Sequence, residues 1–372
     1  MEISVPTLLL DKIKCRNNIR AMAEKAEKNG VRLRPHFKTH QSLQVGEWFR
    51  EFGTEAITVS SLRMARYFAS HGWNDITVAF PVNLLEIDLI NELAAEITLN
   101  LVAVNAESIE LLQQLVKHPV NIWLKIDTGY RRTGIPADDQ HTLENILEAL
   151  DKNLLLNFKG FLAHDGHTYK QTEAEIIKGI HNTTVYLLNQ LAKSYRIRFP
   201  GLQLSIGDTP SCSIVEEIGG VDEIRPGNYV FYDLTQEHIG SCNFEQIAVC
   251  MACPVVATHP DRNEIIIYGG SVHFSKDALF LENGSVMYGL IVELSENGWS
   301  VPVAGIELVS LSQEHGIVRA TAAQFKKYKP GDIMYILPVH SCLTADVMKG
   351  YLTLEGERLE HLSGIPQQVK MS

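Results

Sequence analysis

Short runs of apolar and β-branched residues alternate with longer amphipathic segments through the first two thirds of the chain. Eight runs have the length and composition of buried strands: Val31–Lys38, Ala56–Ser61, Asp75–Phe80, Asn100–Val104, Asn121–Asp127, Phe158–His164, Leu202–Gly207 and Glu223–Asp233. Apolar residues at steps of three and four predict helices between most of them: Leu62–His71, Leu84–Ala95, Ser108–Lys117, Thr142–Lys152 and Glu173–Ser194. This alternation indicates a (β/α)8 TIM barrel, with a doubly wound open sheet as the alternative.

The pattern changes after about Glu237. The later runs are short, rich in β-formers and separated by turn signals: Gln246–Thr258, Glu264–Tyr268, Val286–Leu294, Gly305–Ser310, Ile317–Thr321 and Asp332–Leu337. They predict an antiparallel β domain. We therefore predict an α/β barrel domain over residues 9–236 and a β domain over residues 237–372. The opening run Glu2–Leu10 could pair with either, and we group strand 1–8 with the β domain.

Composition narrows the class of protein. The 372 residues include 33 Lys and Arg against 44 Asp and Glu, a formal charge of −11. This acidic balance and the absence of a basic block argue against a nucleic-acid partner, because phosphate binding needs clustered cations. There is no apolar run of about 18 residues and no basic leader, so we expect no membrane span, no secretory signal and a cytoplasmic protein. The six cysteines are too sparse and irregular to indicate a disulfide framework.

Candidate chemistry in a barrel lies at the carboxyl ends of its strands. In the first strand, a period of two places Arg34, His36 and Lys38 on one face. A lysine crowded by cations loses proton affinity, and a neutral amine is the form that makes a Schiff base with an aldehyde. The alternative is a solvated basic edge strand, and the pattern alone favours neither.

Three other strand ends carry candidate loops. After the seventh strand, Gly207, Asp208 and Thr209 can expose backbone N–H groups to an anion, although the same residue types also suit a helix N-cap. The loop after the fifth strand holds Arg132 between two glycines and could present a guanidinium or be a surface turn. The loop after the sixth strand ends in Tyr169, which suits packing on a flat cofactor or an ordinary loop.

In the β domain, His340 and Cys342 follow an apolar strand. In an extended segment these two side chains point the same way, and imidazole with thiolate suits zinc in an open, catalytic-type site. Taken alone, a buried cysteine beside a hydrogen-bonded histidine is the better interpretation. The CxxC formed by Cys250 and Cys253 lies in an apolar run without a second pair, and we interpret it as core.

Taken together, these motifs resemble one family. The strings RPHFKTH, DTGYRRTG, GHTY, GDTPS and RPGNY and the late HxC occur in this order in the D-threonine aldolase and eukaryotic-type D-serine dehydratase family. That family has the alanine-racemase-like fold of fold-type III pyridoxal-phosphate enzymes. The resemblance spans about residues 1 to 350.

The resemblance implies a role for each matching residue. Lys38 would hold pyridoxal phosphate (PLP), and the cations Arg34, His36, Lys38 and Arg132 would receive this anion. Arg132 matches an arginine near the phenolic oxygen and Tyr169 a tyrosine beside the ring. Gly207 and Thr209 match the phosphate cradle, where Tyr229 would help. Relatives often have Ser in place of Asp208, which must then contribute its backbone N–H or turn away to cap a helix. His340 and Cys342 match the metal pair, which binds zinc in the dehydratase branch.

The implied activity is a lyase reaction on a small-molecule D-3-hydroxy amino acid. Dehydration to a 2-oxoacid and ammonia is preferred, because aldolase relatives tend to carry a carboxylate where this chain has Cys342. The alternatives are retro-aldol cleavage to glycine and an aldehyde, then racemization, which would need no metal. A non-catalytic PLP-binding protein and a metal-dependent barrel hydrolase are the alternatives from other classes. Relatives are dimers, so we expect a homodimer.

Overall fold

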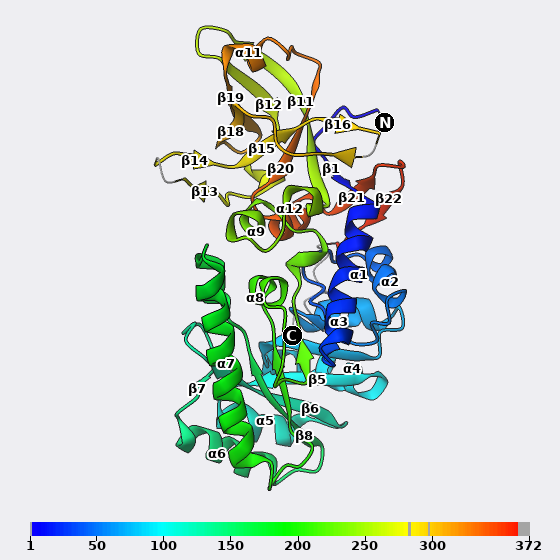
Figure 1. The fold of residues 1–372 in the computed structure, drawn as a ribbon. Helices are drawn as coiled ribbons and strands as arrows, with labels where there is room; N and C mark the ends of the chain where they lie inside the picture. The colour runs from blue at the N-terminus through cyan, green and yellow to red at the C-terminus, as the bar shows by residue number, and fades with distance from the viewer. Residues whose placement is uncertain (1, 282–283, 297, 364–372) are drawn as a thin grey trace. The chain divides into compact units, whose positions relative to one another are not determined.

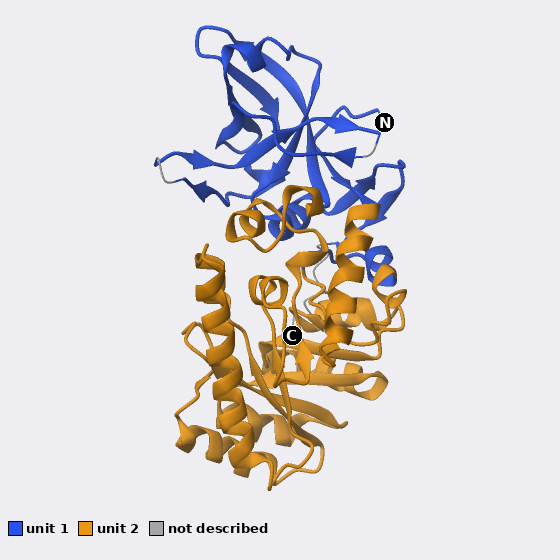
Figure 2. Cartoon of the chain, viewed as in Figure 1, with its two compact units in different colours: residues 1–12, 39–47, 248–372 blue, residues 13–38, 48–247 orange. Residues whose placement is uncertain are grey.

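A computed structural model describes residues 2–281, 284–296 and 298–363. The chain divides into two compact units, which Figure 2 colours separately. Unit 1 comprises residues 1–12, 39–47 and 248–372, and unit 2 comprises residues 13–38 and 48–247. The short segment 39–47 belongs to unit 1 although it directly follows Lys38, the last residue of the first stretch of unit 2.

Unit 2 is built around an eight-stranded parallel sheet (Figure 1). Its neighbouring strands, in spatial order, are β2 (Arg32–Leu33), β10 (Glu223–Ile224), β9 (Gln203–Ile206), β8 (Leu156–Ala163), β6 (Val120–Asp127), β5 (Thr98–Ala103), β4 (Asp75–Pro81) and β3 (Ile57–Val59). A bridge between His36 and Thr58 joins the two ends of this order, so the sheet closes into a barrel. The short strand β7 (Ile135–Pro136) pairs with β6. The predicted barrel is confirmed.

All eight predicted barrel strands exist, with different bounds at the two ends of the series. The predicted run Glu223–Asp233 is a strand only over β10, because Pro226 and Gly227 follow and the chain then forms the 3-10 helix η3 (Asn228–Val230). The predicted run from Val31 pairs along its length through single bonds, such as Phe37 N to the Thr58 carbonyl at 2.8 Å.

Several helices of unit 2 begin at a polar residue whose side chain caps them. Ser61 accepts a hydrogen bond from the N–H of Met64, and Asn105 accepts one from Ser108. The α-helices are α1 (Lys12–Lys28), α2 (Leu43–Arg50), α3 (Leu62–Ala69), α4 (Ile87–Glu96), α5 (Ala106–Leu115), α6 (Gln140–Leu150), α7 (Ala174–Tyr195), α8 (Thr209–Ile214) and α9 (Leu234–Ile239). The remaining 3-10 helices are η1 (Leu84–Glu86), η2 (Gly166–Lys170) and η4 (Phe244–Gln246). The five predicted helices are confirmed, whereas α1, α2 and α9 were not predicted and α8 corresponds to the alternative of a helix start at Asp208.

Unit 1 is a mainly antiparallel β structure, as predicted. Its large sheet has the order β12 (Glu264–Tyr268), β19 (His315–Ala320), β18 (Ile306–Leu311), β15 (Gly289–Val292), β20 (Ile333–Pro338), β11 (Val249–His259), β1 (Thr7–Leu10), β21 (Gly350–Thr353) and β22 (Arg358–Glu360). An extra pairing of β12 with β11 closes six of these strands on themselves. The opening strand β1 pairs antiparallel with β11 and parallel with β21, so it belongs to this sheet.

Short elements complete unit 1. They are the pairs β13 (Leu279–Phe280) with β14 (Val286–Met287) and β16 (Leu294–Ser295) with β17 (Gly298–Trp299), and the helices α10 (Ser271–Phe274), α11 (Ala322–Phe325) and α12 (Ser341–Met348). Cys250 and Cys253 are fully buried in β11, as predicted for core residues. All six cysteines carry free thiols. Within the described residues, no helix has the length and apolarity that crossing a membrane requires.

Candidate active site

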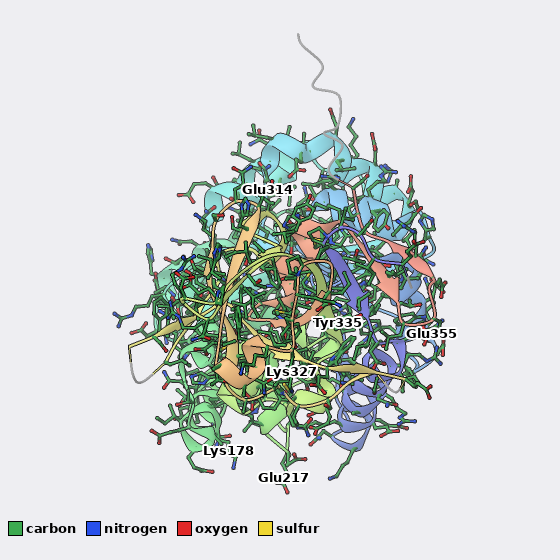
Figure 3. All side chains as sticks on the ribbon, turned by 90° about the horizontal axis from the view of Figure 1, so that it is seen from above. Lys178, Glu217, Glu314, Lys327, Tyr335 and Glu355 are labelled. Carbon is green, nitrogen blue, oxygen red and sulfur yellow. The ribbon has the colours of Figure 1, made fainter. Side chains whose placement is uncertain are left out.

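Most charged side chains lie at the surface, including Glu217 and Glu355, which Figure 3 labels. Buried cations are the exception, because removing a charge from water is costly unless another charge offsets it. Unit 2 buries Arg34, Lys125 and Arg225, each no more than 5% exposed. The groups that surround these three buried cations therefore show where the candidate site lies.

Arg34 is neutralised inside the barrel. Its guanidinium bonds to Glu223 at 2.6 Å and to Asp75 at 2.6 and 3.1 Å. Those two carboxylates stand at the first residues of β10 and β4, away from the carboxyl ends of the strands. The expectation that Arg34 would help to receive an anion is therefore wrong, because its guanidinium is already paired with two carboxylates.

Lys125 and Arg225 lie among cations at the other end of the strands. The pKa of Lys125 is lowered to about 8, first because the side chain is buried and then because Arg132 and Arg225 lie near it. Lys38 lowers that pKa further, whereas Asp127 raises it. The structure thus brings Lys38 and Arg132, both predicted site residues, together with two buried cations that were not predicted.

His164 lies in the same group. Its Nδ1–H donates to the Gly207 carbonyl at 2.6 Å, which fixes the ring orientation. Burial lowers its pKa to about 3, and the charges of Lys38, Arg132 and Arg225 contribute in the same direction. His164 is therefore neutral at physiological pH and cannot supply a proton there. Arg225 donates to the Ala163 carbonyl and to the Ser205 hydroxyl, both at 2.6 Å.

The loop after β6 presents Arg132. Asp127 accepts the N–H groups of Gly129 and Arg131 at 2.9 and 3.0 Å, which closes a tight turn. Gly134 has a φ of +119° and lies so close to Asp127 that a Cβ would meet its backbone nitrogen at 2.9 Å. Both glycines of the motif are therefore required by the turn. Arg132 is exposed, and its guanidinium lies over the Tyr130 ring at 4.9 Å.

The predicted phosphate cradle forms a small hydrogen-bonded unit. The Thr209 N–H donates to the Tyr169 hydroxyl at 3.1 Å, and the Thr209 hydroxyl accepts the Asn228 N–H at 3.1 Å. A Cβ on Gly207 would lie 2.7 Å from the Arg225 backbone, so strand packing alone demands glycine there. The structure thus brings Gly207, Thr209 and Tyr169 together.

Asp208 caps α8 with its side chain. Its Oδ1 accepts the N–H of Ser211 at 2.8 Å and lies 2.9 Å from the Thr168 hydroxyl, so the capping alternative is the one observed. Burial first, and then the charge of the buried Asp165, raise its pKa to about 7. Asp165 accepts from Thr128 at 2.7 Å and from Thr184 at 2.8 Å, but burial still raises its pKa.

Tyr229 lies in η3 and is fully buried. Its ring forms a T-shaped pair with Phe49, with 6.3 Å between the ring centroids. Its hydroxyl has no hydrogen-bond partner among the described residues, although a buried Tyr hydroxyl usually has one.

The two predicted residues after β2 lie close to each other in the chain. The Nδ1 atom of His36 accepts a hydrogen bond from the backbone N–H of Lys38 at 3.3 Å, and the Lys38 side chain is exposed.

The predicted metal pair lies in unit 1, at the start of α12. His340 is the N-cap residue and Cys342 is already in the first helical turn, so the prediction of an extended segment was wrong. His340 Nδ1 forms a short hydrogen bond with Asp277, which lowers the pKa of that carboxyl. Cys342 Sγ lies 3.3 Å from the hydroxyl of the buried Thr39.

These residues fit the groups that the family resemblance implies. Asp127 is the carboxylate that opposes the cations around Lys125, while Glu223 and Asp165 face Arg225. The positive charge around Lys125 and the unpaired hydroxyl of Tyr229 suit a polyanionic cofactor such as PLP. In the part of the chain that the structure describes, no three His, Cys, Asp or Glu side chains are arranged around a common metal position. An imidazole and a thiolate are ligand types that a divalent metal accepts, so the chemistry of His340 and Cys342 fits a site in which other ligands complete the coordination.

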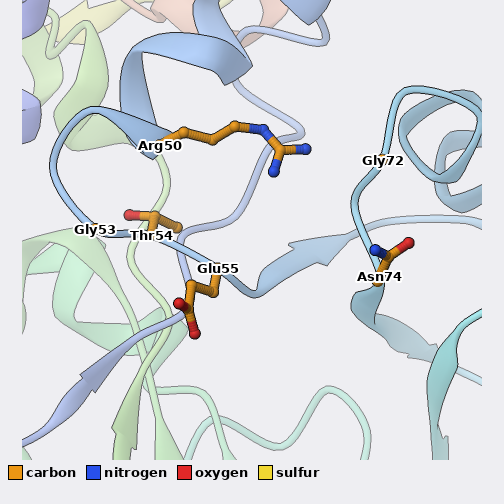
Figure 4. A pocket seen from close by; sticks show the side chains of 6 residues that line it. All are labelled: Arg50, Gly53, Thr54, Glu55, Gly72 and Asn74. Carbon is orange, nitrogen blue, oxygen red and sulfur yellow. The ribbon is translucent and has the colours of Figure 1, made fainter.

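A hollow of about 390 Å³ lies elsewhere in unit 2. Figure 4 shows its lining, which includes Arg50, Glu55 and Asn74. These residues precede β3 and β4, so the hollow faces the amino ends of the strands. The Arg50 guanidinium lies 4.0 Å from the Trp73 ring, a contact that stabilises the core, and none of the predicted site residues lines the hollow.

Lys125, Arg225, Asp165, Asp277 and Thr39 are the residues that sequence reasoning missed. The first three could have been noticed as charged residues in or next to apolar runs, because such residues are buried only with partners. Asp277 and Thr39 carry no local signal, because each reaches its partner across a long stretch of chain.

Two family profiles match the chain. The alanine racemase N-terminal domain matches residues 10–234, and the serine dehydratase domain matches residues 248–354. The D-serine dehydratase of Dictyostelium discoideum is 30% identical, with 94% of this chain and 93% of that protein covered. The D-threo-3-hydroxyaspartate dehydratase of Delftia sp. (strain HT23) is 29% identical, with 96% of both covered.

Solved structures agree with these sequence matches. The structure of the Delftia dehydratase superimposes with a TM-score of 0.89 at 27% identity and 98% coverage of both chains. The D-threonine aldolase of Filomicrobium marinum superimposes with a TM-score of 0.81 at 18% identity and 97% coverage of both, which supports the fold. The chain therefore belongs to the D-threonine aldolase and eukaryotic-type D-serine dehydratase family of PLP-dependent lyases, with the alanine-racemase-like fold.

Proposed function

We propose that this chain is a PLP-dependent lyase that dehydrates a D-3-hydroxy amino acid to a 2-oxoacid and ammonia. The observation that carries the proposal is the gathering of Lys38, Arg132 and Arg225 around the buried Lys125, because this concentration of positive charge favours binding of an anion. The relatives named as dehydratases of D-serine and D-threo-3-hydroxyaspartate support the substrate class.

The residues that would hold the cofactor lie at the carboxyl ends of the barrel strands. Lys38 would attach it, with His36 and Arg132 beside it. Tyr169 would lie beside its ring, and Gly207 and Thr209 would hold its phosphate with help from the Tyr229 hydroxyl. Asp208 would cap the helix that begins there. When bound, PLP supplies an electron sink for negative charge at the substrate Cα.

Lys38 would also transfer the substrate proton. Once its amine is released, Lys38 would take the Cα proton of the D-amino acid as a general base. His164, whose pKa is lowered to about 3, is a far weaker base than an amine and does not compete for that role.

The metal would be held by His340 and Cys342. A divalent ion there would act as a Lewis acid on the substrate β-hydroxyl or carboxylate. We propose zinc, because a thiolate ligand favours a soft or borderline ion. The metal-free form solved for a cysteine-to-alanine variant of the Delftia dehydratase supports a metal role for this cysteine position.

The second candidate is retro-aldol cleavage to glycine and an aldehyde. Similarity to the D-threonine aldolase of an Arthrobacter species, 23% identical with 97% of this chain covered, supports it. Racemization comes third, because it has no use for the His340 and Cys342 pair. We further propose a cytoplasmic homodimer: six free thiols suit a reducing compartment, and the dimer rests on the family resemblance.

The test is a product analysis on the purified, PLP-loaded protein. D-serine, D-threonine, D-threo-3-hydroxyaspartate and D-alanine are each incubated with and without a chelator, and oxoacid, aldehyde and L-enantiomer are assayed. Oxoacid that disappears on chelation and returns with zinc supports the proposal. Aldehyde with glycine as the main products would replace dehydratase by aldolase. Retention of the visible cofactor band after borohydride reduction and in Lys38→Ala would contradict the role of Lys38. Light scattering gives the oligomeric state.

A further inference from the structure

We propose that Asp277 and Thr39 are positioning residues for the metal pair. Asp277 orients the His340 ring so that Nε2 presents its lone pair to a divalent metal, and the Thr39 hydroxyl orients the Cys342 sulfur. This inference rests on the metal site of the proposed function and extends it to residues that do not touch the metal.

The contact between Asp277 and His340 determines the tautomer of the ring. A carboxylate can only accept, so the hydrogen on Nδ1 must be donated to Asp277. In a neutral imidazole the other nitrogen then carries the lone pair. Metal-bound histidines commonly have such an acceptor behind them, which fixes the ring and raises its basicity as a ligand.

The segment that carries Asp277 is held against α12. The Thr344 hydroxyl lies 3.1 Å from the Phe274 carbonyl and 3.0 Å from the His340 carbonyl, so one side chain of α12 joins the end of α10 to the N-cap. Ser275 follows with a φ of +70°, and its hydroxyl accepts the N–H of Asp277 at 3.2 Å. A left-handed non-glycine residue persists only where its surroundings hold it, so the direction of Asp277 is built into the loop.

The contact between Thr39 and Cys342 is similarly supported from the segment 39–47. Thr39 is fully buried, so its hydroxyl must bond within the protein, and Cys342 Sγ lies at 3.3 Å. Gln41 donates to Asp346 of α12 at 3.0 Å, and the Tyr351 hydroxyl donates to the His40 carbonyl at 2.6 Å. With a thiolate at position 342, the Thr39 hydroxyl becomes the donor.

The two contacts act on the two ligands separately. Asp277 bonds to Nδ1 of His340, which leaves Nε2 to face a metal, and the hydroxyl of Thr39 contacts Sγ of Cys342. Both arise in chain segments far from α12, so neither could be set by the local HxC motif. The pair is therefore oriented before a metal arrives, which is the arrangement expected of a preorganised site.

Zinc affinity tests this inference directly. The zinc-loaded, PLP-containing enzyme is titrated with a chromogenic chelator, and histidine tautomers are read from ¹⁵N chemical shifts. Asp277→Asn should weaken zinc binding about 10- to 100-fold and remove the preference for Nδ1–H at His340. Thr39→Val, which keeps the shape without the hydroxyl, should weaken zinc binding by a smaller factor. Asp277→Glu should recover part of the affinity.

Controls separate this inference from the proposed function. Asp261→Asn, an exposed carboxylate on the turn after β11, should leave zinc affinity unchanged. If His340→Ala and Cys342→Ala also leave it unchanged, the proposed metal site itself is wrong. If those two abolish binding while Asp277→Asn keeps wild-type affinity and tautomer, only the positioning role is wrong. Should Asp277→Asn fail to fold, Asp277→Ser gives the same readouts, and the visible PLP band reports an intact unit 2.

Discussion

Lys38, Lys125 and Arg225 come from three different barrel strands or strand ends, whereas His340 and Cys342 lie two positions apart at the start of one helix. In unit 2 the parallel sheet brings distant residues together, and their charges then tune one another. In unit 1 the two candidate ligands lie close together in the chain, and residues distant in sequence contact them. The barrel site therefore depends on the whole fold of its unit, whereas the pair His340 and Cys342 depends on a short segment and a few contacts.

The largest effect expected from this comparison is that of Lys38. Lys38→Ala should lower dehydratase kcat by about 10³-fold or more and remove the borohydride-sensitive visible band, because both attachment and the general base are lost. Zinc affinity of the variant should stay at the wild-type value, since the pair is oriented within unit 1. A parallel loss of zinc would show that the two sites are not independent.

The converse prediction concerns the metal pair. Cys342→Ala should lower kcat by about 10²- to 10³-fold while the visible PLP band remains, because several kcal/mol of Lewis-acid stabilisation is lost without any change in unit 2. Steady-state kinetics with added zinc measure this effect. Activity that is indifferent to the substitution and to chelation would contradict the metal role.

The third prediction concerns the buried ion pairs of Arg34 in unit 2 and their effect on the free energy of unfolding. Arg34→Met should lower the free energy of unfolding by about 3 to 5 kcal/mol, because it leaves the buried Glu223 without its cation, whereas the partly exposed Asp75 keeps Arg32. Urea unfolding followed by fluorescence measures the change. The matched control is Arg198→Met, whose ion pairs to Glu144 and Asp151 are exposed and should contribute less than about 1 kcal/mol. Equal losses in the two variants would contradict a buried network.

The smallest predicted effect is a pH dependence in unit 2. The pKa of Asp208 is raised from its ordinary value to about 7, so the folded state binds the proton more tightly than the unfolded chain. Its stabilising contribution is present below about pH 4 and is lost as pH rises through about 7. Asp208→Asn mimics the protonated form and should remove this slope, gaining roughly 2 to 4 kcal/mol on the wild type between those pH values. Unfolding curves over this range with an unchanged slope in the variant would contradict the assignment.

Several predictions succeeded because they depend on periodicity. Alternation of buried strands with helices of period 3.6 identified the eight barrel strands, and the run of β-forming segments identified unit 1. Helix α12 was missed because His340 and Cys342 were interpreted as a continuation of β20. Nothing local to Ser341 or Cys342 distinguishes a helix start from an extended segment, and the choice is made by packing around the buried Thr344.

Periodicity and short motifs were enough to predict the fold and the family, because both are properties of residues close together in the chain. Which charges meet was set by the tertiary structure. It paired Arg34 with Glu223 and Asp75, left Lys125 among cations, turned Asp208 to cap α8, and placed Asp277 and Thr39 behind the metal pair. Burial and pairing set the charge and direction of these groups, and both depend on residues that chain order does not bring together.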